Sequence, residues 1–69
     1  MTTAKVTKSV YGNYRGVIGG KIAKDIGCNE FDAKEWLSNA LRGGLVLSNA
    51  SHLGMAEITA HRNRCGDAN

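Results

Sequence analysis

The chain has 69 residues, of which 42% are hydrophobic, and its formal net charge is +3. This length allows one small core, so we expect residues 1–69 to form a single domain, and the hydrophobic content excludes a disordered chain. The longest uncharged run, residues 43–56, is too short to cross a bilayer, and we expect no membrane partner. The positive charge is compatible with nucleic-acid binding but does not establish it.

Residues 1–21 fit two different structures. Apolar residues from Val6 to Val17 recur at spacings of four, four and three, which indicates a helix, but its glycines would each cost up to about 1 kcal/mol there. The alternative is a hairpin with strands at Lys5–Tyr11 and Tyr14–Ile18, joined by a Gly12-Asn13 turn. The sequence leaves both structures open.

Residues 20–27 predict a short helix. Ile22, Ala23 and Ile26 fall on one helical face, and Gly27 is a typical residue after a helix end. The few residues that follow allow only a tight connection to the next element. Two helices joined in this way describe a helix-turn-helix.

The helix Asn29–Arg42 is the clearest element of the sequence. Asp32 and Glu35 fit a capping box, and Asn29 is an alternative N-cap one turn earlier. Gly43-Gly44 suits the end of the helix, because glycine adopts the left-handed conformation easily. Apolar residues with helical spacing form one face: Ala33, Trp36, Leu37, Ala40 and Leu41.

After this helix the hydrophobic pattern changes. Leu45–Leu47 is a short apolar run, and residues 48–54 form a turn-rich loop. Met55–Thr59 fit a returning strand, but the apolar residues do not alternate cleanly, so a helix over residues 53–64 stays open as an alternative. Residues 62–69 are polar and are expected to form a flexible tail.

The segment from Ile22 to Val46 resembles the helix-turn-helix and wing entry of winged-helix DNA-binding domains. The matching residues are Ile22, Ala23, Gly27, Ala33, Leu37 and the run Gly44-Leu45-Val46. The segment AKDIG is also similar to the corresponding segment of phage Cro-type repressors. The resemblance implies a small α+β fold, a winged helix-turn-helix with a C-terminal β-hairpin wing.

This resemblance implies a non-enzymatic protein of transcription-regulator type that binds double-stranded DNA, and its small size favours binding as a homodimer. The helix around Asp32–Arg42 would read the major groove, with the loop at residues 48–54 as the tip of the wing. Four outward side chains of the helix would contact bases and phosphates: Lys34, Ser38, Asn39 and Arg42.

The hairpin alternative leads to a rival resemblance. An N-terminal β-hairpin, one central helix and a last strand (ββαβ) are similar to small phage-encoded inhibitors, anti-CRISPR proteins among them. Such a protein would bind and block a larger protein or nucleoprotein complex in the host cytoplasm. A second basic and aromatic surface would serve either function, and it comprises Lys8, Tyr11, Tyr14, Arg15 and Lys21.

The sequence indicates no chemistry beyond binding. Cys28, His52, His61 and Cys65 lack the two close pairs of a structural zinc site, so we expect no metal. No spacing suggests a Ser-His-Asp or Cys-His set, and we expect neither an enzyme nor a cofactor. The polar start MTTAKVTKS lacks the apolar core of a secretory signal, so we expect a cytoplasmic protein with two free thiols.

Overall fold

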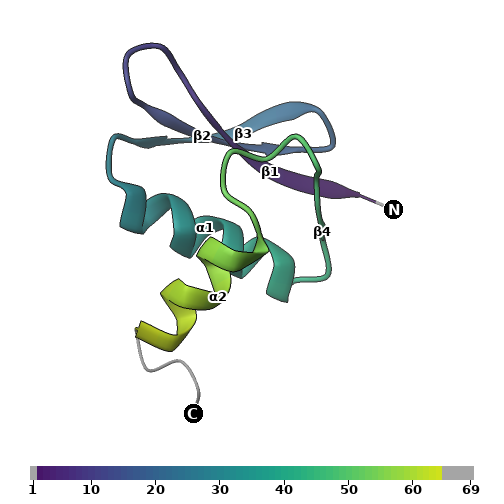
Figure 1. Cartoon of the computed structure of the whole chain (residues 1–69). Helices are drawn as coiled ribbons and strands as arrows, with labels where there is room; N and C mark the ends of the chain where they lie inside the picture. Colours follow the sequence, from purple (N-terminus) through teal and green to yellow (C-terminus); the bar gives the residue numbers. More distant parts are fainter. Residues whose placement is uncertain (1, 65–69) are drawn as a thin grey trace.

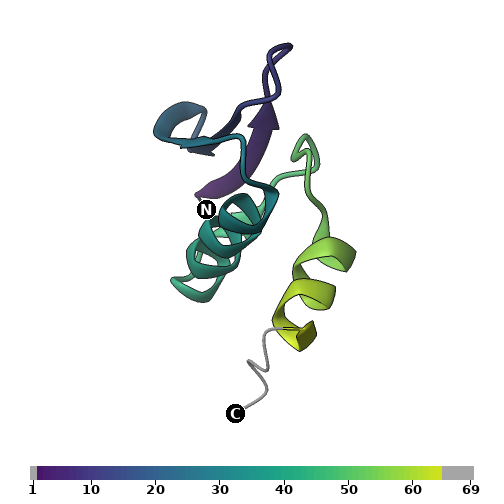
Figure 2. The same cartoon turned by 90° about the vertical axis from the view of Figure 1, so that its left-hand side faces the viewer.

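The chain, represented by a computed structural model that describes residues 2–64, is a small α+β domain. The elements follow in the order β1 (Thr3–Lys8), β2 (Tyr14–Ile18), β3 (Lys21–Gly27), α1 (Glu30–Arg42), β4 (Val46–Leu47) and α2 (Met55–Arg64). The strands form one mixed sheet in the order β3-β2-β1-β4. Both helices lie on the same side of this sheet, with α1 between the strands and α2 (Figures 1 and 2).

The strands β1, β2 and β3 form an antiparallel meander. The register of β1 and β2 places Val6 opposite Gly16. In the turn between them Gly12 has a φ of +86°, a conformation that glycine adopts at no steric cost. The hairpin predicted for residues 1–21 is therefore confirmed and the helical alternative is wrong, but the first strand is Thr3–Lys8 rather than Lys5–Tyr11, and Tyr11 lies in the turn.

Residues 20–27, predicted as a short helix, form β3 from Lys21 onward. Gly19 and Gly20 precede this strand with φ values of +61° and +85°. Positive φ at both central residues is what a type I′ hairpin turn requires, and such a turn returns the chain antiparallel to β2. The turn and the strand ladder override the helical spacing of the apolar residues. The helix-turn-helix prediction is therefore wrong for this segment.

The helix predicted at Asn29–Arg42 is confirmed as α1. Its N-cap is Asn29, whose Oδ1 accepts the N–H groups of Phe31 at 2.9 Å and Asp32 at 3.4 Å. The alternative cap at Asn29 is therefore correct, rather than the capping box that begins at Asp32. The helix ends at Gly43, whose N–H donates to a carbonyl of the last turn.

The C-terminal part contains a helix where a strand was predicted. Met55–Thr59 belong to α2, so the helical alternative for residues 53–64 is correct. The short strand β4 pairs in parallel with β1, and the chain then follows the edge of β1, where the His52 N–H donates to the Val6 carbonyl at 2.6 Å. Within residues 2–64 there is therefore no C-terminal hairpin wing. The ββαβ alternative is correct in its N-terminal hairpin, its central helix and a strand after that helix, which is β4, but it lacks β3 and α2. Of the predicted flexible tail, residues 62–64 lie in α2 and residues 65–69 lie outside the described part.

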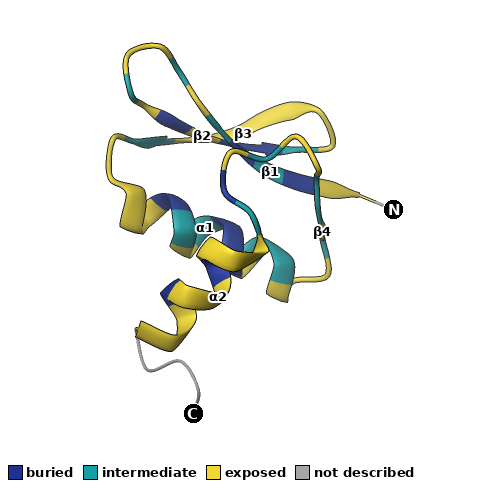
Figure 3. Cartoon of the chain, in the orientation of Figure 1, coloured by how far each residue is buried: buried dark blue, intermediate teal, exposed yellow. Residues whose placement is uncertain are grey.

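The core fills the space between the sheet and the two helices (Figure 3). Its largest fully buried side chains are Leu37, Ile58 and Val6. Trp36 is only partly buried and packs at the margin of this core, where its indole ring covers Gly16. The core residues from all parts of the chain are Ala4, Val6, Tyr14, Ala33, Leu37, Leu53 and Ile58. Neither helix of the described chain is long and apolar enough to span a membrane.

Candidate nucleic-acid interface

The four residues that were predicted to read DNA from α1 do not form one outward surface. Ser38 is only 5% exposed, so the prediction that it faces outward is wrong. Lys34 is paired with Glu30, and its side chain is 19% exposed. Asn39 and Arg42 are exposed. The winged-helix resemblance implied a hairpin after α1. The chain instead forms α2, which packs against α1.

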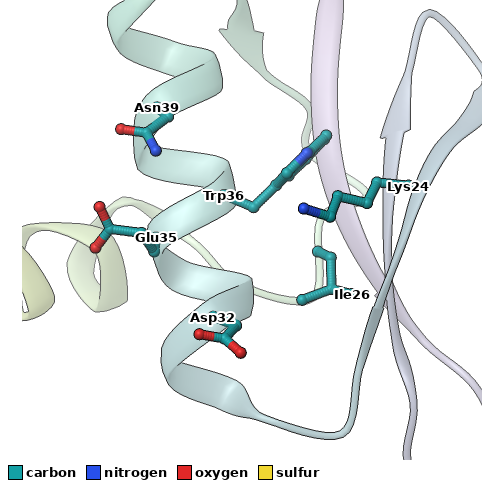
Figure 4. Close-up of a pocket in the computed structure, with 6 residues that line it drawn as sticks. All are labelled: Lys24, Ile26, Asp32, Glu35, Trp36 and Asn39. Carbon is teal, nitrogen blue, oxygen red and sulfur yellow. The ribbon is translucent and has the colours of Figure 1, made fainter.

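The side of α1 that stays open next to the sheet is acidic. Asp32 and Glu35 lie there with Asn39. They line a groove of about 360 Å³ together with Trp36 of α1 and with Lys24 and Ile26 of β3. Figure 4 shows Trp36 pointing from α1 toward the strands, with the Lys24 side chain extending toward it. Two carboxylates against one ammonium group make this groove unattractive to phosphate.

Tyr14, predicted as part of the second contact surface, is buried in the core with 3% exposure. Its ring fills the space beneath the start of α1, and its hydroxyl donates to Glu30 Oε1 at 3.2 Å. The Lys8 ammonium lies 5.3 Å from the centre of the ring. The prediction that Tyr14 is available for contacts is therefore wrong, because the packing of α1 on β2 covers it.

Glu30 links this tyrosine to the first turns of α1. Lys34 Nζ lies 3.0 Å from Glu30 Oε2. The hydrogen bond and the charge of Lys34, followed by the hydrogen bond from Tyr14, hold the pKa of the Glu30 carboxyl below its ordinary value of 4.5. The ionised carboxylate is thus favoured by the fold.

We expect Glu30→Gln to make the domain less sensitive to acid. Because the folded pKa lies below the unfolded one, the Glu30 carboxylate contributes stability above the unfolded pKa, and this contribution is lost as the pH falls through the folded pKa. The effect is small because the carboxylate is exposed and screened by solvent. Urea midpoints at neutral pH and at a pH of about 3 should fall further for the unmodified protein than for E30Q. Equal declines would contradict the predicted linkage.

The basic side chains are concentrated in the N-terminal meander. Residues 2–28 carry five lysines and arginines and one acid, Asp25, whereas residues 29–64 carry four basic and four acidic residues. The five basic residues are Lys5, Lys8, Arg15, Lys21 and Lys24. The net charge of the whole chain does not reveal that basic residues are concentrated in one segment. The order of the residues does, because no acidic residue precedes Asp25.

The outer face of the meander points away from both helices. Residues opposite each other on neighbouring strands project from the same face, and the register pairs Lys5 with Val17 and Thr7 with Arg15. Alternate residues of β1 face the other way, since Val6 is fully buried. Lys5, Thr7 and Arg15 therefore lie on the outer face. Both helices lie on the other side of the sheet (Figure 2).

The hairpin between β1 and β2 projects beyond the rest of the sheet (Figures 1 and 2). Its tip carries Val10, which is 95% exposed, and Tyr11, which is 87% exposed. The Ser9 hydroxyl accepts the N–H groups of Tyr11 and Asn13, each at 3.2 Å. Of the two tyrosines predicted for the second surface, only Tyr11 is presented to solvent.

Residues 2–64 contain no group of three or more His, Cys, Asp or Glu side chains that could hold a metal ion. His61 is buried, with Nε2 3.0 Å from Glu35 Oε1 and its ring against the edge of Phe31. Cys28 is an exposed free thiol, and Cys65 lies outside the described residues. These contacts hold His61 between α1 and α2.

Neither protein-family models, nor curated proteins, nor solved structures give a significant match to this chain, so no relative identifies it as a winged-helix or phage-inhibitor protein.

Proposed function

We propose that the protein binds double-stranded DNA without catalysis, and that the outer face of β1–β3, rather than α1, makes the contact. The observation that carries this proposal is the pair of cations on this face, Lys5 and Arg15, in a segment (residues 2–28) with five basic residues and one acid. Two others of the five, Lys8 and Lys24, lie on the helix side of the sheet. The phosphate backbone supplies much of the affinity of DNA-binding proteins, and it attracts a basic face. The side of α1 next to the groove carries Asp32 and Glu35, whose negative charges would repel the phosphate backbone.

The geometry of the meander supports the same proposal. The major groove accepts a two-stranded β-ribbon as well as a helix, and several DNA-binding proteins read it with strands. Lys5 and Arg15 offer cations on this face, and Thr7 lies between them as a hydrogen-bonding side chain. Asp25 lies opposite Arg15 in the sheet, so its negative charge offsets part, but not all, of the positive charge on this face. A module of this size covers few base pairs, so binding as a homodimer is part of the proposal.

We expect the double variant Lys5→Gln/Arg15→Gln to bind mixed duplex DNA about tenfold more weakly at low salt. The loss of two phosphate contacts should also reduce the slope of log K against log salt by about 2. A fluorescence-anisotropy titration at several salt concentrations measures both quantities. Circular dichroism of each variant establishes that the fold is retained.

The matched control is Lys34→Gln/Arg42→Gln, which removes the same charge from α1. If the sheet face contacts DNA, this pair should bind nearly as well as the unmodified protein. If α1 reads the groove, as the winged-helix resemblance implies, this control should lose affinity instead. Equal losses in both pairs would mean that only net charge matters, and the sheet-face assignment would be wrong.

A second candidate function is the inhibition of a larger protein or nucleoprotein complex, as in small phage inhibitors. The observation that favours it is the acidic row of Asp32 and Glu35 along the groove beside Trp36. A carboxylate row of this kind complements a basic surface such as the nucleic-acid channel of a partner. This function predicts no salt-dependent binding of duplex DNA in the titration above.

A further inference from the structure

The hairpin tip presents two large apolar side chains that no intramolecular packing accounts for. Val10 and Tyr11 are the two most exposed large hydrophobic residues among those described, and neither belongs to the core. Turns usually contain glycine, asparagine or aspartate because these residues suit the backbone. Here Gly12 meets that need with a φ of +86°. Val10 and Tyr11 are therefore not required by the turn itself.

The backbone of the tip is held in one conformation by its own hydrogen bonds. The Ser9 N–H donates to the Asn13 carbonyl at 2.8 Å, and the Gly12 N–H donates to the Ser9 carbonyl at 3.0 Å. The Ser9 hydroxyl accepts two further N–H groups of the loop. An ordered loop presents its side chains to a partner with a smaller loss of conformational entropy on binding.

The surroundings of the tip are cationic. Lys8 ends β1 directly before it, and Arg15 is the second residue of β2 after it. No acidic residue occurs in the chain before Asp25. The tip therefore combines a positive base with an apolar end. A complementary surface has anionic rims and apolar groups on its floor, and the major groove of DNA has this arrangement, with phosphates at its edges and thymine methyl groups inside.

We propose that Val10 and Tyr11 enter the major groove and contact thymine C5-methyl groups. This inference rests on the proposed function, because it assigns a second kind of contact to the same DNA. Lys5 and Arg15 would then supply the electrostatic part of the affinity, which falls as the salt concentration rises. Val10 and Tyr11 would supply an apolar part that salt does not screen. The tip would also give the protein a preference for thymine-containing steps.

The test uses one mixed duplex in two forms, with thymine or with uracil in every thymine position, because uracil lacks only the methyl group. The unmodified protein should bind the uracil duplex several-fold more weakly. Val10→Ser/Tyr11→Ser should bind the thymine duplex about tenfold more weakly, with an unchanged salt slope, and should not distinguish the two duplexes. Met55→Ser, which removes an exposed apolar side chain from α2, is the matched control and should behave as the unmodified protein does.

The outcomes separate the two proposals. Salt-dependent binding that is equal for both duplexes, or an equal loss on both duplexes in the tip variant, would overturn the methyl contact and leave DNA binding intact. A changed salt slope in the tip variant would also overturn it, because neither side chain carries charge. The absence of salt-dependent duplex binding in the unmodified protein would overturn the proposed function itself, and with it this inference.

Discussion

Gly16→Ala is expected to destabilise the domain by about 1–3 kcal/mol, although alanine in a strand usually stabilises relative to glycine. Gly16 lies in β2 beneath the indole ring of Trp36. A Cβ at this position would lie 2.5–2.6 Å from three atoms of the ring, far inside van der Waals contact. The φ of Gly16 is not in the left-handed region, so the cost is steric rather than conformational. Trp36 would have to move and leave a gap between α1 and the sheet.

Urea unfolding followed by circular dichroism measures this loss. Gly43→Ala is the matched control, because Gly43 has a φ of −78° and a Cβ there would lie 3.5 Å from the carbonyl oxygens of Asn39 and Ala40, an ordinary contact. The control should change stability by no more than about 0.5 kcal/mol. Trp36→Leu in the Gly16→Ala background should recover part of the loss, since the smaller side chain leaves room for the new methyl group. A Gly16→Ala variant as stable as the unmodified protein would refute this packing.

Leu37→Ala is expected to cost about 2–5 kcal/mol, because it removes a fully buried side chain and leaves a cavity. Leu37 lies at the centre of the core, on the face of α1 that meets the sheet. Small domains have total stabilities near the low end of about 5–15 kcal/mol, so the variant should retain at most about 3 kcal/mol.

Thermal and urea denaturation of Leu37→Ala and Leu41→Ala measure the difference between two leucines of one helix. Leu41 is only partly buried and packs against the core from its margin, so its truncation should cost clearly less. The ranking of the two variants is the critical result. A Leu41→Ala variant that is as unstable as Leu37→Ala would place the centre of the core elsewhere.

The helix α1 could be predicted from the sequence because independent local signals agree on it. Asn29 at its start, the glycines after Arg42 and the apolar stripe all indicate the same residues. The strand β3 could not be predicted in this way. It is an edge strand with mostly exposed residues, so it lacks the alternation of a half-buried strand. The helix α2 was ambiguous for a related reason, since only Ile58 and His61 are buried in it.

The candidate site was predictable in its charge and not in its geometry. The basic bias of the first 24 residues can be read directly from the sequence. The burial of Tyr14 and Ser38, in contrast, depends on where α1 lies on the sheet and where α2 lies on α1. These are contacts between segments far apart in the chain, and local patterns carry no information about them. The predictions of exposed residues were therefore wrong at positions where an element distant in the sequence packs over the side chain.

The pairing of β4 with β1 has a consequence for the order in which the chain can fold during synthesis. β1 is made first, yet the Val6 N–H donates to the hydroxyl of Ser51, 45 residues later. A nascent chain that ends before this loop can form the meander and α1 but leaves one edge of its earliest strand open. Open strand edges pair readily with other chains. Between the emergence of residue 42 and that of residue 52, this edge of β1 is thus available to other chains.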